Sequence, residues 1–88
     1  MAVGLIFDIP GVTQAQYEQV RDEVAPGNHR PPGMLYHAAG PTEQGWCVAE
    51  IWESHEALDR FLDDKVRPAL QRAGIHGQPR IFEVFNTM

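Results

Sequence analysis

The stretch Trp46-Cys-Val-Ala-Glu-Ile-Trp-Glu-Ser54 decides the fold, because it joins an apolar strand directly to the start of an amphipathic helix. Residues 46–52 are rich in the aromatic and β-branched side chains that favour strands. Ser54 is a typical N-cap residue, and apolar side chains then recur at helical spacing as far as Ala73. We therefore predict a strand over 46–52 and the main core helix over 55–73, with Gly74 as its stop.

Pro68 lies inside that helical stretch and has no N–H for a helical hydrogen bond. We therefore expect a kink or a break near Val66 and Arg67. After a loop over 75–79, residues 80–85 alternate like a strand, and Asn86 is expected at the end of this last strand.

Upstream of Trp46, residues 34–39 read as a strand, and the Gly- and Pro-containing segment 40–45 supplies a hairpin turn. The strand over 34–39 is therefore predicted to pair antiparallel with 46–52. Residues 3–8 form another short apolar run, which is expected to be the first strand.

A first helix is expected to begin at Thr13, which can form a capping box with Gln16. Tyr17, Val20 and Val24 recur on one face of this helix, and polar residues, Arg21 among them, surround the other face. Pro26 and Gly27 are expected to end it.

The element order βαββαβ predicts an α+β, ferredoxin-like domain over residues 1–88, with both helices on one face of a four-stranded antiparallel sheet. The other face has no helix to cover it, yet both faces carry apolar side chains. By strand alternation Leu5 and Phe7 lie on the face opposite to Ile6, and Val48 and Ile51 likewise lie on opposite faces. A second copy of the chain is the simplest cover, and we predict a homodimer through the sheet face.

Charge and composition exclude several function classes. Seven Lys and Arg against twelve Asp and Glu give a net charge of −5, which argues against nucleic acid and anionic membranes as partners, and neither is predicted. No apolar run approaches the ~20 residues that cross a bilayer. Cys47 is the single cysteine, which rules out an intrachain disulfide, suits a reducing compartment and leads us to expect a cytoplasmic protein. The histidines lack the spacing of a metal site, so no metal is predicted.

Several motifs resemble the dimeric α/β-barrel superfamily, in particular small domains related to antibiotic-biosynthesis monooxygenases. They lie along nearly the whole chain: Tyr17, the strand Gly33-Met-Leu-Tyr-His37, the pair Gly45-Trp46, the corner Trp52-Glu53-Ser54 and the end Val84-Phe85-Asn86. The resemblance implies two sheets that close into a barrel across a dimer axis, with a ligand cleft in each subunit between sheet and helices. Members include cofactor-free quinone-forming monooxygenases, haem-degrading enzymes and polyketide cyclases. Because the core helix has no histidine beyond His55, the haem-degrading pattern is not matched and no cofactor is predicted.

Two residues are candidates for catalysis. Strand alternation places Glu50 between Trp46 and Trp52 on one face, where a carboxylate in apolar surroundings can serve as a general acid or base. His37 lies in the neighbouring strand and would be a base that Glu50 orients, if both face one cavity. Parity in the strands does not decide this, and a purely structural hydrogen bond of His37 is the alternative.

Five further residues are candidate ligand contacts, each with a structural alternative: Tyr17, Tyr36, Trp46, Trp52 and Asn86. The two tryptophans and Tyr36 would form apolar walls, and Tyr17 and Asn86 would bond to ligand oxygens. The hypothesis is a small homodimeric protein that binds an aromatic or polyketide-like molecule, with cofactor-independent oxygenation or cyclisation as its chemistry. The alternative is a non-catalytic ligand-binding or stress-related dimer.

Overall fold

The computed structural model describes all residues from Met1 to Met88. Its strands and helices follow one another in the predicted βαββαβ order, with the second helix divided into three segments. In chain order they are β1 (Val3–Pro10), α1 (Gln14–Val24), the short 3₁₀ turn η1 (Pro26–Asn28), β2 (Met34–Pro41), β3 (Gly45–Trp52), α2 (His55–Phe61), η2 (Leu62–Val66), α3 (Arg67–Ala73) and β4 (Arg80–Glu83).

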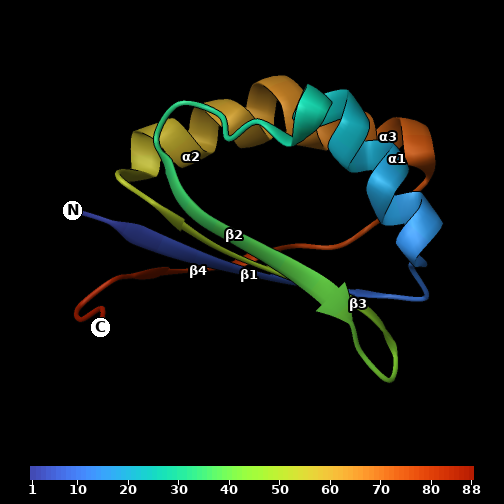
Figure 1. Ribbon diagram of the computed structural model, residues 1–88, viewed down its shortest axis with the longest axis horizontal. Helices are drawn as coiled ribbons and strands as arrows, with labels where there is room; N and C mark the ends of the chain where they lie inside the picture. Colours follow the sequence, from blue (N-terminus) through green and yellow to red (C-terminus); the bar gives the residue numbers. More distant parts are fainter.

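The four strands form one antiparallel sheet in the order β2-β3-β1-β4. All helices lie on the same side of this sheet, and nothing in the chain covers the other side (Figure 1). This is the ferredoxin-like α+β fold, and the sequence prediction of the fold class is confirmed.

Alternation along the strands separates the two faces of the sheet. In β3 every second side chain is buried, ending with Trp52, and the side chains between them are only half-buried. In β1 the odd-numbered residues from Val3 to Ile9 are buried against the helices. The core therefore lies between the helices and one face of the sheet, where these side chains meet Leu58 and Leu62 of the long helix.

The helix starts are those expected from the sequence. The Thr13 hydroxyl accepts the Gln16 N–H, and the Gln16 side chain accepts the Thr13 N–H, which completes the capping box of α1. Ser54 caps α2 by accepting the Ala57 N–H. Gly74 ends α3 with a φ of 70°, the left-handed conformation that glycine adopts without a steric cost.

The regular α-helix is interrupted near Val66 and Arg67, where the sequence predicts an irregularity, because α2 ends at Phe61 and α3 begins at Arg67. Residues Leu62–Val66 between them form a π-helical segment, in which the Arg67 N–H donates to the Leu62 carbonyl. This segment directly precedes Pro68, which lies in the first turn of α3 and has no N–H to donate to a preceding carbonyl. The three segments α2, η2 and α3 therefore run on as one helical body.

The last strand is shorter than predicted. It ends at Glu83, and a single further bond, from the Val84 N–H to the Ala2 carbonyl, continues its pairing. Asn86 therefore lies beyond the sheet and is exposed, which corrects its expected place at the end of the last strand. None of the helices is both long enough and apolar enough to cross a lipid bilayer.

Candidate functional site

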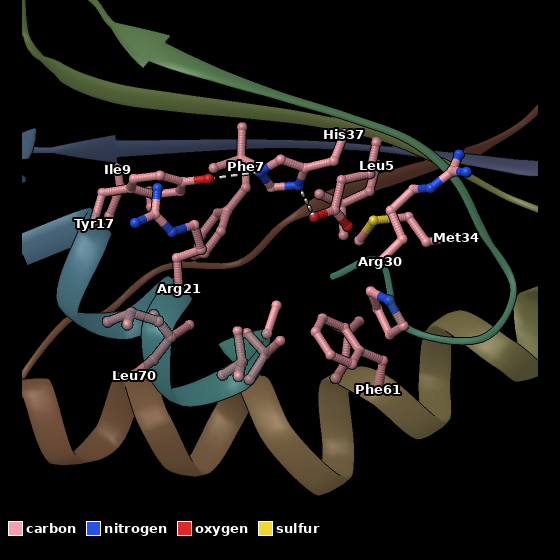
Figure 2. Close-up of a pocket in the computed structure, with 18 of the residues that line it drawn as sticks. Leu5, Phe7, Ile9, Tyr17, Arg21, Arg30, Met34, His37, Phe61 and Leu70 are labelled. Atoms are coloured by element: carbon pink, nitrogen blue, oxygen red, sulfur yellow. Dashed lines mark hydrogen bonds and ion pairs between the residues drawn. The ribbon is translucent and has the colours of Figure 1, made fainter. Parts of the chain in front are cut away.

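A cavity of about 210 Å³ lies between the sheet and the helices. Its sheet side is formed by Leu5, Phe7 and Ile9 of β1, together with residues of β2 and β3. Its helix side is formed by Phe61, Leu62, Val66 and Leu70, and these two walls face each other in Figure 2. The lining is mostly apolar, which is typical of small-molecule sites.

Polar side chains from three elements meet at one wall of this cavity. Tyr17 comes from α1, His37 from β2 and Glu50 from β3. The Tyr17 hydroxyl lies 2.6 Å from His37 Nε2, and His37 Nδ1 lies 2.7 Å from Glu50 Oε2. Figure 2 marks both contacts as dashed lines, with Tyr17 and His37 approaching each other at the top of the cavity. We call these three residues the Tyr17–His37–Glu50 relay.

Hydrogen-bond partners fix the direction of the relay. Glu50 Oε1 accepts the indole N–H of Trp52 at 2.9 Å, and Oε2 faces His37 Nδ1. Because a carboxylate only accepts hydrogen bonds, Nδ1 carries the proton that it donates to Glu50. In a neutral imidazole Nε2 is then the acceptor, and the Tyr17 hydroxyl donates to it.

Glu50 is the most buried residue of the relay. The His37 side chain is 26% exposed and that of Glu50 is 9% exposed. Tyr17 is half-buried at the cavity wall, and burial raises its pKa; Arg21 lowers that pKa and Glu50 raises it further. The tyrosine hydroxyl therefore stays protonated at neutral pH and is available as a donor.

A β-bulge brings His37 and Glu50 to the same face of the sheet. Met34 pairs with Trp52, and Tyr36 pairs with Ile51, so that Leu35 is one extra residue in β2. The extra residue reverses the alternation, and both Met34 and His37 face the helices although they are three residues apart. The predicted cross-strand pair of His37 and Glu50 is present for this reason.

The two tryptophans pack against residues of the relay without lining the cavity. Trp46 is buried and stacks on Tyr17 with ring centres 5.3 Å apart, and Trp52 is fully buried against Phe61 at the same distance. Neither lines the cavity, so the expected role of these side chains as its walls is corrected. Their packing holds Tyr17 in place on one side and orients Glu50 on the other.

Two other predicted contact residues lie away from the cavity. Tyr36 points to the uncovered face of the sheet opposite Ile51 and is 58% exposed, because successive residues of a strand alternate and its neighbour His37 faces the cavity. Asn86 lies beyond β4 and is exposed. The structure thus brings together Tyr17, His37 and Glu50, and it leaves Tyr36 and Asn86 outside.

Three basic residues at the cavity were not identified as site residues from the sequence: Arg21, His29 and Arg30. Arg21 was expected on the polar face of the first helix. Its position four residues after Tyr17 was the available signal, since residues at this spacing are neighbours on a helix surface. Its guanidinium carbon lies 5.9 Å from the centre of the Tyr17 ring.

Comparisons with known proteins agree with the fold. No family model matches the sequence, and no curated protein does. A candidate antibiotic biosynthesis monooxygenase from Chloroflexus aurantiacus J-10-fl has a similar structure, with a TM-score of 0.73 at 18% identity, covering 100% of this chain and 97% of the other. SnoaB, a cofactor-independent oxygenase from Streptomyces nogalater, has a TM-score of 0.69 at 17% identity, covering 99% and 95%.

A third similar structure is a dimeric ferredoxin-like protein of unknown function from Thermobifida fusca YX. Its TM-score is 0.63 at 18% identity, and the match covers 93% of this chain and 88% of the other. At these identities the likeness shows a shared fold. The structural relatives thus share the ferredoxin-like fold and include proteins of the antibiotic-biosynthesis-monooxygenase type, which agrees with the resemblance of the sequence motifs.

Proposed function

We propose that this protein binds an aromatic or polyketide-like molecule in the cavity and that the Tyr17–His37–Glu50 relay takes a proton from it. The observation that carries the proposal is the unbroken hydrogen-bonded chain at the wall of an apolar cavity. Such a chain combines a donor at the ligand, an imidazole base and a carboxylate that orients it, which is the arrangement of general-base sites.

The relay changes the role that the sequence suggested for His37. Both ring nitrogens are engaged, so the group that meets the ligand is the Tyr17 hydroxyl. A phenolic O–H or an acidic C–H of the ligand would give its proton to the Tyr17 oxygen, while the Tyr17 proton passes to His37 Nε2. Glu50 would stabilise the imidazolium that forms. His37 then acts as the base through Tyr17, and Glu50 as its orienter.

Two reactions can follow from the ligand anion without a cofactor. An anthrone-type CH₂ group that has lost a proton can react with dioxygen, and the hydroperoxide loses water to leave a quinone carbonyl. Alternatively, an enolate carbon can attack a carbonyl within the same polyketide chain, with loss of water. The likeness to SnoaB, a cofactor-independent oxygenase, supports the first reaction by analogy of fold.

The test is oxidation of a hydroxyanthrone, followed by dioxygen uptake and by quinone absorbance. Tyr17→Phe and His37→Gln should each lower kcat by about 10²- to 10⁴-fold, the range that a positioned acid or base supplies. His55→Gln is the matched control, because His55 is exposed at the start of α2 and pairs with Asp59 there. Turnover that is unchanged in His37→Gln would exclude the relay as the base, and tight binding without turnover would favour the non-catalytic ligand-binding dimer.

We also propose that the uncovered sheet face is the interface of a homodimer. The face carries half-buried Ile6 and Ile51 and exposed Tyr36, together with Phe82, which is 48% exposed. Gly4 lies beneath Phe82, and a side chain at Gly4 would collide with that ring. An apolar face of this kind is usually covered, and a dimeric ferredoxin-like protein among the structural relatives supports a second copy as the cover.

A further inference from the structure

We infer that the ligand of this cavity carries an anionic group, of the aromatic carboxylate type, which binds Arg21 beside Tyr17. The inference rests on the proposed function of the cavity as a ligand site, and it names the class of ligand. Two observations support it: the distribution of charge around the cavity and the position of the Arg21 guanidinium.

The cavity is basic although the chain is acidic. Twelve Asp and Glu outnumber seven Lys and Arg in the sequence, yet two arginines, Arg21 and Arg30, and His29 line the cavity. Glu50 is the one acidic side chain in the lining, and both of its oxygens already accept hydrogen bonds. Within the lining the two arginines outnumber the single carboxylate, so a ligand that enters the cavity meets a wall of net positive charge.

Arg21 is the cation placed next to the relay. It extends from α1 toward Tyr17 in Figure 2, and its guanidinium lies over the face of the tyrosine ring. Its one carboxylate partner is Asp22, the next residue in the sequence, whose side chain is 67% exposed. An exposed pair of this kind is weak, and both contacts use a single oxygen of Asp22, so further N–H donors of Arg21 are free for a ligand.

Arg30 is placed differently. Its Nη1 donates to the Leu35 carbonyl at 2.9 Å, and Figure 2 shows it extending away from the middle of the cavity. Arg30 and His29 are exposed and add to the positive potential at the cavity, which attracts an anion. Direct contact with the anionic group is assigned to Arg21.

The remaining lining residues indicate the size and the polarity of the rest of the ligand. Apart from the relay and the basic residues it is mostly apolar, and Phe7 and Phe61 lie on its opposite sides (Figure 2). A cavity of about 210 Å³ is smaller than the ~300–1,000 Å³ of typical drug-sized sites. Together these features fit a compact aromatic body with a carboxylate at one end, such that the carboxylate reaches Arg21 and a neighbouring hydroxyl or C–H reaches Tyr17.

The experiment compares two probes of matched shape, 2-naphthoate and the neutral 2-naphthamide, by isothermal titration calorimetry at neutral pH. The wild-type protein should bind naphthoate about tenfold more tightly, which corresponds to about 1.4 kcal/mol. Arg21→Gln should reduce this preference to about twofold or less. Arg67→Gln, which removes an arginine paired with exposed Asp63 away from the cavity, should keep the full preference.

The possible outcomes test the anionic ligand, the assignment to Arg21 and the cavity function separately. Equal affinity for the two probes would overturn the anionic ligand while the proposed cavity function stands. A preference that disappears in Arg30→Gln and persists in Arg21→Gln would overturn the assignment to Arg21. If neither probe binds the wild-type protein, the cavity is not a ligand site for aromatic molecules, and the proposed function fails together with this inference.

Discussion

At the scale of single residues, Glu50 is the one buried acidic side chain of the protein, and it has a partner for each oxygen. A buried carboxylate without such partners would be strongly destabilising. The hydrogen bonds from the Trp52 indole and the His37 imidazole thus reduce the free-energy cost of burying the carboxylate. The carboxylate in turn fixes which nitrogen of His37 faces Tyr17.

The raised pKa of Tyr17 predicts a loss of stability in alkaline solution. The ordinary tyrosine pKa is about 10, so the unfolded chain releases this proton at a lower pH than the folded protein does. The contribution is complete below about pH 10 and is lost as the pH rises from there through the folded pKa. The free energy of unfolding should fall in that window by at most about 1.4 kcal/mol per pH unit from this group.

Chemical unfolding at several pH values above 9 measures this slope. Tyr17→Phe should flatten it, whereas Tyr36→Phe should not, because Tyr36 is 58% exposed and lies outside the cavity. Identical slopes in wild-type protein and Tyr17→Phe would contradict the prediction.

The polar residues of the candidate site were predictable from the sequence, and their arrangement was only partly so. His37 and Glu50 stand out as polar residues in apolar strands, and both are in the relay. Simple alternation does not show that they share a face, because the extra residue Leu35 reverses the parity of β2. Tyr36 was also expected at the cavity, but neighbouring strand residues face opposite sides, so Tyr36 lies on the other face once His37 faces the cavity.

At the scale of elements, α1 carries two residues of the site, Tyr17 and Arg21, and yet has no fully buried residue. Little packing therefore stabilises this helix, and its capping box is expected to matter more than in a core helix. The Arg72–Glu23 ion pair links α1 to α3, but both side chains are exposed and the pair is expected to add little.

Thr13→Ala should lower the stability of the protein by about 1 kcal/mol, because the Gln16 N–H loses its acceptor and the box is broken. For a domain of this size the melting temperature should fall by about 4–8 °C. Thermal unfolding followed by circular dichroism measures the change. Thr87→Ala, at an exposed position near the C-terminus, is the control, and a melting temperature equal to that of wild type in Thr13→Ala would contradict the role of the cap.

The elements themselves were largely predictable, because caps and turns have local signatures. Thr13, Ser54 and Gly74 bound their helices as expected. The π-helical segment before Pro68 was not predictable, because local sequence shows where a helix is disturbed but not how the surrounding packing absorbs the disturbance. Its residues Leu62 and Val66 line the cavity, so this local irregularity also shapes the site.

At the scale of the whole molecule, the two faces of the sheet have different surroundings. Its helix-facing side holds the core and the cavity, and its uncovered side holds the proposed dimer interface (Figure 1). Val48 and Ile51 represent the two sides, because Val48 is buried at 8% exposure and Ile51 is half-buried on the opposite face.

An aspartate on either side should have a different effect. Val48→Asp places a charge in the core and should unfold the protein, at a cost of several kcal/mol. Ile51→Asp places it on the uncovered face and should give a folded monomer, whereas the wild-type protein is expected to be a dimer. Sedimentation velocity and circular dichroism separate the two results, and a wild-type protein that sediments as a monomer at micromolar concentration would refute the dimer.

The bulge at Leu35 has a consequence for how such proteins diverge. Because one extra residue lets Met34 and His37 both face the helices, a single insertion or deletion between Gly33 and His37 would force one of the two side chains onto the outer face of the sheet. Two related chains could therefore keep every residue of the relay and differ in whether the relay exists. Chain length at this one position, together with the identity of the histidine, would then distinguish relatives that share the relay from those that share only the fold.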